Sequence, residues 1–235
     1  LQRLNTPGSK ILTVEDPVEY QIAGVNQVQV RPGIDLTFAT ALRAILRQDP
    51  DILMIGEMRD TETARIAVQA ALTGHKVLST LHTNDAASSV TRLLDMQVAD
   101  YLLIATLDGI LAQRLVRRLC PHCRQPWHPD AEWAAGIGLA ALAGAPRPLL
   151  YRPGGCERCE HTGFRGRIGI IELLQMTAQV RHAVLSRQDA AAIRRSALDE
   201  GMISLREDGL RKALDGLTTV AEVERVTQVV GDALV

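Results

Sequence analysis

The stretch that most constrains the fold of this chain is residues 48–57, which read QDPDILMIGE. The letters DPD form a turn signal, four apolar residues follow, and the run stops at Gly56 and Glu57. A short apolar run between turn residues is typical of a strand buried on both faces, as in a parallel sheet. Ligands of such sheets bind beyond the carboxyl ends of the strands. Glu57 is placed there and can hold a magnesium ion; the alternative is a solvated glutamate at a strand end.

Two more predicted strands deliver polar side chains to the same edge. Residues 10–14 form a strand that ends at Glu15, and residues 76–81 form one that ends at His82. A helix predicted over 61–72 lies between the second and third strands, which gives the βαβ pattern of a parallel sheet. Two carboxylates and an imidazole therefore meet at one edge. For His82 alone, the alternative is a histidine that caps the next helix.

The remaining N-terminal segments have simpler patterns. Residues 1–4 are predicted to be the end of a helix, which the NTPGS turn then breaks. Residues 25–30 alternate apolar and polar, as a half-exposed strand does. Residues 37–48 have the spacing of an amphipathic helix that must end before Pro50.

The chain has four cysteines in two CxxC pairs: Cys120 and Cys123, then Cys156 and Cys159. Because no secretory feature accompanies them, this pairing indicates metal binding rather than disulfides. Two CxxC pairs complete a closed, tetrahedral, four-sulfur site, so a bound zinc ion would be structural. The alternatives are free thiols or redox pairs, and His122 or His161 could replace a cysteine. The segment 131–148 between the pairs is predicted to be a short helix and a loop.

The C-terminal part is predicted to be helical after the apolar run 168–174. Ser204 can cap a helix that ends at Gly216, with Glu207 at its third position. A last helix begins at Thr218 or Thr219 and has one apolar side, formed by Val223, Val226 and Val230.

Composition excludes two classes of function. The net charge is −1 and aromatic residues make up 3% of the chain, which argues against nucleic acid as the main partner. No apolar run reaches the ~18 residues that a membrane span needs.

Three segments resemble the motifs of the secretion ATPase superfamily. Residues 14–20, VEDPVEY, resemble its acidic box, residues 46–60 resemble its Walker B region, and residues 72–84 resemble its histidine box. Their order and spacing match as well, and the resemblance covers almost the whole chain. The type II secretion ATPase and the type IV pilus assembly ATPase are the most similar members. These are ring-forming, usually hexameric motors with a RecA-like core.

The resemblance implies an α/β, RecA-like P-loop NTPase core that hydrolyses ATP with Mg²⁺. Glu57 would hold Mg²⁺ through water, and Glu15 would orient or deprotonate the attacking water. His82, with His75 as a second candidate, would sense the γ-phosphate. Phosphoryl transfer also needs positive charge on the departing phosphate. Candidates are Arg43, Arg47 and Arg59, with surface ion pairs as the alternative for each.

One departure is that the sequence contains no GxxxxGK[ST] phosphate loop. In the family this loop lies just upstream of the position where this chain begins, so we expect an incomplete core. The expected domains are a RecA-like core over 1–118, a four-cysteine zinc insertion over 119–166 and a helical subdomain over 167–235. The last would pack subunits in the ring or act as an intramolecular cap.

The expected partners are further copies in a homohexamer and the inner-membrane platform and cytoplasmic-domain proteins of the machinery. The expected location is the cytoplasmic face of the inner membrane. The four-cysteine insertion favours a secretion or assembly motor over a retraction motor. Two other classes remain open: a non-catalytic, zinc-containing adaptor and a redox protein that uses its CxxC pairs.

Overall fold

The computed structural model describes residues 1–227 and divides by contacts into two compact units. The first unit comprises Leu1–Thr83, Ala87–Asp108 and Met176–Ser196, and the second comprises Asn84–Ala86, Gly109–Gln175 and the chain from Ala197 onward. These units cut across the boundaries predicted from sequence, and the predicted domains remain a prediction. Within the described residues, every helix is too short or too polar to cross a membrane.

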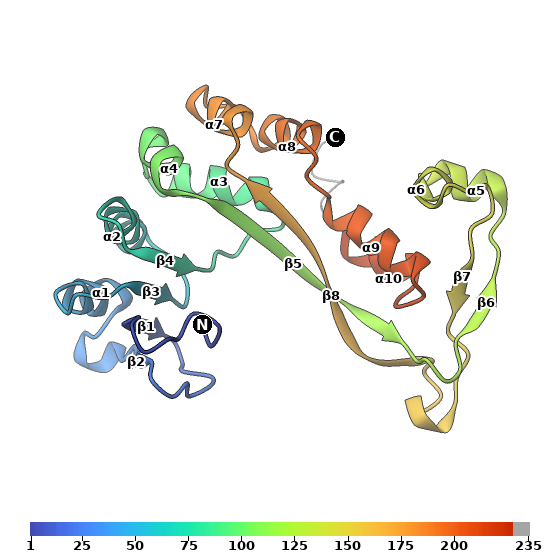
Figure 1. Cartoon of the computed structure of the whole chain (residues 1–235), viewed down its shortest axis with the longest axis horizontal. Coiled ribbons are helices and arrows are strands. Elements are labelled where there is room, and N and C mark those ends of the chain that lie inside the picture. Colours follow the sequence, from blue (N-terminus) through green and yellow to red (C-terminus); the bar gives the residue numbers. More distant parts are fainter. Residues whose placement is uncertain (228–235) are drawn as a thin grey trace. The chain divides into compact units, whose positions relative to one another are not determined.

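The first unit is built on a four-stranded parallel sheet (Figure 1). Its strands are β1 (Ile11–Glu15), β2 (Asn26–Gln29), β3 (Ile52–Ile55) and β4 (Lys76–Ser79), in the order β2-β1-β3-β4. All neighbouring pairs are parallel, and Leu53 of β3 is in register with Leu12 of β1 and Val77 of β4. Leu53 is fully buried. The predicted parallel sheet and its buried central strand are therefore confirmed.

Two helices pack on this sheet and complete its core. In α1 (Phe38–Leu46), Thr37 is the N-cap and forms a capping box with Thr40. In α2 (Thr61–Leu72), Asp60 accepts a hydrogen bond from the backbone N–H of Thr63. Side-chain caps of this kind stabilise a helix by about 1 kcal/mol each. Both helices were predicted, but residues 2–4 form a turn and not a helix, because so short a segment cannot sustain successive helical hydrogen bonds.

The remaining helices of the first unit come from two distant parts of the chain. These are α3 (Ala86–Asp95), α4 (Asp100–Thr106), α7 (Ala178–Leu185) and α8 (Ala190–Asp199). The first residue of α3, Ala86, and the last three residues of α8, from Ala197, belong to the second unit. Helix α4 packs against α7, and Asp100 accepts a hydrogen bond from Arg187 at 3.0 Å. A short 3-10 turn, η1 (Pro32–Ile34), precedes α1.

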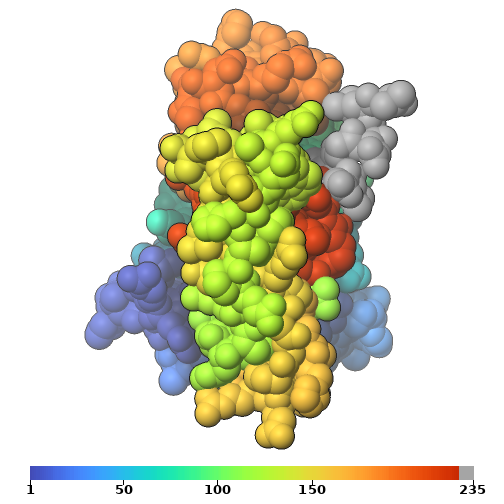
Figure 2. Space-filling view, turned by 90° about the vertical axis from the view of Figure 1, so that its right-hand side faces the viewer, coloured from blue at the N-terminus to red at the C-terminus, as the bar shows by residue number. Residues whose placement is uncertain are grey.

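The second unit is organised around a long antiparallel ribbon. It consists of β5 (Gly109–Leu119) and β8 (Phe164–Gln175), with Ala112 opposite Glu172 and Arg114 opposite Ile170. Between these strands lie the antiparallel pair β6 (Gln125–Trp127) and β7 (Leu150–Arg152), two short helices, α5 (Ala131–Gly136) and α6 (Leu139–Ala143), and the turn η2 (Glu157–Cys159). Figure 2 shows the yellow-green and golden segments of this region side by side.

Two helices, α9 (Leu205–Leu214) and α10 (Val220–Thr227), complete the second unit. Ser204 caps α9 by accepting the N–H of Glu207 at 3.2 Å, as predicted. Val223 is fully buried and Val226 is half-buried. The predicted extension of the apolar side to Val230 lies outside the described residues.

Candidate functional site

The carboxyl ends of β1, β3 and β4 carry the polar residues singled out by sequence. Glu15 is the last residue of β1, Glu57 follows β3 after Gly56, and His82 follows β4. Both glutamates are 8% exposed. The close packing has a local cause: a Cβ on Gly56 would lie 3.2 Å from the Val14 carbonyl oxygen. Glycine therefore lets β3 deliver Glu57 beside β1.

Glu57 and His82 are brought into direct contact. His82 Nε2 lies 3.0 Å from Glu57 Oε2, and Arg59 donates to Glu57 Oε1 at 2.5 Å. The His82 and Arg59 side chains are 83% and 65% exposed, whereas that of Glu57 is 10% exposed. The hydrogen bond from Arg59 lowers the pKa of Glu57, against the opposing effect of burial, and His82 lowers it further. The buried carboxylate of Glu57 is therefore contacted by two largely exposed side chains, those of Arg59 and His82.

Glu15 has its own set of partners. Its Oε1 accepts from Thr13 Oγ1 at 2.5 Å and from Gln27 Nε2 at 2.9 Å. Gln27 also accepts from the Ile22 N–H and donates to the Tyr20 carbonyl, so it ties the loop before β2 to the carboxylate. Sequence reasoning missed Thr13 and Gln27, because they meet at Glu15 through the pairing of β1 with β2, which no local pattern of the sequence marks.

His75 is placed differently from His82. Its Nδ1 lies 3.0 Å from both Thr73 Oγ1 and the Ala70 carbonyl oxygen, at the end of α2. His75 precedes β4, whereas His82 follows it, so the structure does not bring His75 to Glu57. This placement ties His75 to the C-terminal end of α2, and its predicted contact with the γ-phosphate stays a prediction.

The three candidate arginines also separate. Arg59 contacts Glu57, whereas Arg43 forms an exposed ion pair with Glu62 of α2. Arg47 is exposed at the end of α1. The structure therefore brings Arg59, and neither of the other two, to the carboxylate.

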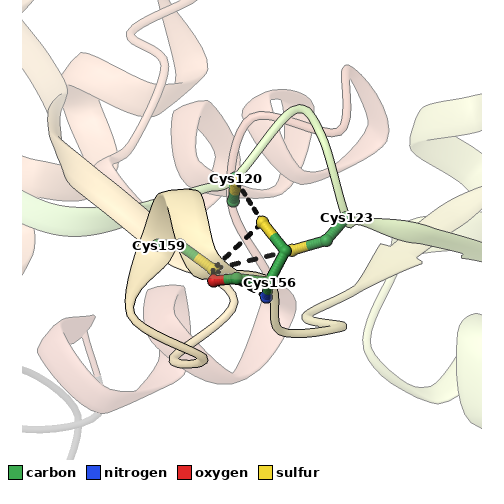
Figure 3. A group of neighbouring side chains, drawn as sticks. All are labelled: Cys120, Cys123, Cys156 and Cys159. Carbon is green, nitrogen blue, oxygen red and sulfur yellow. Dashed lines mark hydrogen bonds between the residues drawn. The ribbon is translucent and has the colours of Figure 1, made fainter.

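The four cysteines converge in the second unit (Figure 3). Their Sγ atoms all lie within 4.8 Å of one another. The Sγ–Sγ separation is 3.9 Å for Cys120 and Cys156, 3.7 Å for Cys123 and Cys159, and 3.7 Å for Cys156 and Cys159. Four sulfurs at about 2.3 Å from a tetrahedral zinc ion lie about 3.8 Å apart. The cluster thus has the donor set and dimensions of a zinc site.

Backbone N–H groups point at these sulfurs. Gly155 N–H donates to Cys123 Sγ, and Gly163 N–H donates to Cys159 Sγ, both at 3.2 Å. Burial alone would raise the pKa of the Cys159 thiol, but the N–H groups of Cys156 and Gly163 outweigh it and lower the pKa to about 6. Burial and the neighbouring thiols instead raise the pKa of Cys156 to about 11. The thiolate, which is the form that binds metal, is therefore favoured at Cys159 and disfavoured at Cys156.

The glycines of the cluster are required by space as well as by conformation. Gly155 has φ +119, and a Cβ there would lie 2.9 Å from the His161 carbonyl oxygen. The ring of His122 instead contacts Arg158 at 3.0 Å. Among residues 1–227, the cysteines are the one group of three or more His, Cys, Asp or Glu side chains placed to share an ion. His122 and His161 are outside it.

Fold and site together define the class: an α/β protein whose parallel sheet resembles the core of the ATPases PilT and DotB. The crystal structure of the pilus retraction motor PilT with bound ADP has a TM-score of 0.67 with this chain, at 28% identity, covering 95% of this chain and 54% of that one. The Yersinia pseudotuberculosis ATPase DotB gives 0.67 at 25% identity, covering 95% and 50%.

The chain belongs to the Type II/IV secretion system protein family, whose family model matches residues 1–225. It is 54% identical over 228 residues to the type II secretion system protein E of Dickeya dadantii. It is also 54% identical over 225 residues to the type IV pilus assembly ATPase PilB of Thermus thermophilus. The chain is covered to 97% and 95% but spans 45% and 25% of these relatives.

Proposed function

We propose that this chain is the part of a secretion-type ATPase that carries its metal carboxylate and histidine box. The parent would be a homohexameric motor that hydrolyses ATP to power type II protein secretion or type IV pilus assembly. The single observation that carries this proposal is the contact of the buried Glu57 with His82 at the carboxyl edge of the parallel sheet. Family membership and the names of the relatives support it.

In this proposal each residue contacts one component of the reaction: the metal shell, the attacking water or the γ-phosphate. Bound Mg²⁺ and ATP would supply the transferred phosphoryl group and the charge that stabilises its transition state. Glu57 would hold Mg²⁺ through a water molecule, with a carboxylate that its lowered pKa keeps ionised. Glu15, fixed by Thr13 and Gln27, accepts a hydrogen bond from the attacking water. His82, which contacts Glu57 in this structure, would contact the γ-phosphate. Arg59 would leave Glu57 and pair with the negative charge of the phosphate.

The cysteine cluster is proposed to hold one structural zinc ion. Closed four-sulfur coordination leaves no position for a substrate, so the ion would fix the fold between β5 and β8. This module is also the proposed contact for inner-membrane platform and cytoplasmic-domain proteins. The proposed location is the cytoplasmic face of the inner membrane.

The test is turnover by the full-length protein. Glu57→Gln should lower kcat for ATP by about 100-fold or more, because one carboxylate contact to the metal shell is lost. The matched control is Glu62→Gln, which alters an exposed carboxylate of the same unit in an ion pair with Arg43. It should leave kcat within about twofold, since exposed pairs contribute about 0–1 kcal/mol. Equal activity of the Glu57→Gln variant and the wild type would contradict the assignment.

The isolated 235-residue chain should show negligible turnover, because it contains no phosphate loop. Turnover by the isolated chain that Glu57→Gln abolishes would contradict this prediction. The second candidate is a non-catalytic, zinc-containing interaction fragment or adaptor. It is favoured by the cysteine cluster alone and would be supported by a full-length protein that binds its partners without hydrolysing ATP.

A further inference from the structure

The last residue of the histidine box, Asn84, begins a segment of three residues that the second unit holds. Asn84–Ala86 belongs to that unit by its contacts, although His82 and Thr83 belong to the first. This short segment connects the loop after β4 to helix α3. It is held from one face of the β5–β8 ribbon.

The first contact is made by a buried carboxylate on β8. Glu172 is 2% exposed, and its Oε1 accepts the N–H of Ala86, the first residue of α3, at 2.8 Å. Its Oε2 accepts the N–H of Leu205, the first residue of α9, at 3.1 Å. One carboxylate thus satisfies unpaired N–H groups at two helix N-termini, where negative charge is favoured.

The second contact comes from the partner strand. Arg114 Nη2 donates to the Asn84 side-chain oxygen at 3.0 Å and to its carbonyl oxygen at 3.3 Å. In the ribbon, Ala112 is opposite Glu172 and Arg114 is opposite Ile170. Because alternate strand residues share a face, Arg114 and Glu172 project from the same face of the ribbon. Two neighbouring side chains therefore hold both ends of Asn84–Ala86.

The other end of the same loop is fixed within the first unit. Thr80 Oγ1 donates to the Gly56 carbonyl oxygen at 2.6 Å, and the Met58 N–H donates to the Thr80 carbonyl oxygen at 3.0 Å. His82 lies between these two attachments and is itself 83% exposed. An exposed side chain has few neighbours to hold it, so its position depends on the backbone at each end of the loop.

We propose that Glu172 and Arg114 are positioning residues that set the place of His82 by holding Asn84–Ala86. The role rests on the proposed function, in which His82 contacts the γ-phosphate. The same ribbon leads to the cysteine cluster, since Cys120 follows β5 and Cys159 precedes β8.

The test is a double-mutant cycle in the full-length protein. Glu172→Gln should lower kcat about tenfold and keep KM for ATP within about twofold. The substitution replaces one carboxylate oxygen, which accepts a backbone N–H, with an amide NH₂ group that cannot accept it. In a His82→Ala background it should lower kcat by less than about twofold, because the residue it positions is already gone. A purely structural role predicts the same fold-loss with and without His82, and that result would overturn the proposal.

The matched control is Glu222→Gln. Glu222 is another carboxylate of the second unit, also 2% exposed, whose contacts are with Arg117 and Arg225. Its replacement should give the same fold-change in kcat in both backgrounds. If Glu172→Gln fails to fold, Arg114→Ala removes the Asn84 contact and leaves the carboxylate in place, with the exposed Arg118→Ala as its control.

Amide hydrogen exchange separates failure of this proposal from failure of the proposed function. If the full-length wild type hydrolyses no ATP, the proposed function fails. Amide exchange alone then decides whether Glu172 and Arg114 hold the segment Asn84–Ala86. Glu172→Gln and Arg114→Ala should each raise the exchange rate of residues 82–86 about tenfold or more, whereas Glu222→Gln and Arg118→Ala should not. Unchanged exchange of residues 82–86 in both variants would overturn the proposal.

Discussion

Glu222 of the second unit is a buried carboxylate that two arginines contact. It is 2% exposed, and its oxygens accept hydrogen bonds from the Arg117 N–H and side chain and from Arg225. Burial raises the pKa of Glu222, but the hydrogen bonds from Arg225 and Arg117 outweigh it and bring the pKa to about 2. The folded state therefore holds this carboxylate in its charged form.

This arrangement predicts a specific dependence of stability on pH. The folded pKa lies below the ordinary value of 4.5, so the stabilisation is fully present above about pH 4.5 and is lost as the pH falls towards 2. Glu222→Gln should reduce the slope of the free energy of unfolding against pH in that window. Chemical denaturation between pH 5 and pH 2 measures it, and equal slopes for variant and wild type would contradict the pKa assignment.

At the residue scale, the sequence located Glu15, Glu57 and His82 at strand ends, because turn residues and short apolar runs mark where strands stop. It could not reveal their partners. Thr13 and Gln27 reach Glu15 only because β1 and β2 pair in one register. His75 was grouped with His82 by the motif, yet it hydrogen-bonds at the end of α2. The roles of these residues in catalysis remain predictions.

At the scale of elements, helix packing in the second unit depends on one small residue. Gly209 is buried in α9, and a Cβ there would lie 2.5 Å from Val223 Cγ1 of α10. The absence of a side chain allows the two helices to approach closely. Glycine is an unfavourable residue within a helix by roughly 0.5–1 kcal/mol, so close packing must more than offset that cost.

Gly209→Ala should therefore destabilise the chain by about 1–3 kcal/mol, because overpacking outweighs the gain in helix propensity. The matched control is Gly136→Ala at the end of α5, where an added Cβ meets nothing within 4 Å. That variant should be neutral or stabilised by up to about 1 kcal/mol. Denaturant unfolding of both variants measures the difference, and a more stable Gly209→Ala variant would show that α9 and α10 can separate freely.

Elements with clear caps and periodicity were predictable, and one long element was not. The strands and helices through β4 lie close to their predicted bounds, because Asp60 and Thr37 mark helix starts and Pro50 forces an end. No strand was predicted at Gly109–Leu119. Its residues pair with β8, which lies more than forty residues away along the chain, and such long-range pairing leaves little local signal.

At the scale of the whole molecule, each unit has its own apolar core. The parallel sheet and its two helices enclose one cluster, and Val116, Ile170 and Leu205 form another in the second unit. The cysteine cluster belongs to the second unit alone. Loss of a bound metal should therefore affect the two units unequally.

We expect the chain to bind one zinc ion, and chelation or Cys123→Ser should raise amide exchange in residues 119–166 while β1–β4 stay protected. Metal binding of this kind contributes directly to the folding free energy. His122→Ala is the control and should retain the ion, since its ring contacts Arg158 and not the cluster. Loss of zinc from the control, or a reversible disulfide in place of metal, would contradict the prediction.

The sequence by itself determined the parallel α/β sheet, the paired cysteines and the residues at its strand ends, because each depends on a local pattern of apolar runs, turns and spacings. Only the tertiary structure decided which of these residues touch. The contact of Glu57 with His82, the separation of His75 from both, and the hold of Glu172 on Ala86 depend on register between segments distant in the chain. Register is set by cooperative packing of whole elements, and no local window of sequence contains it.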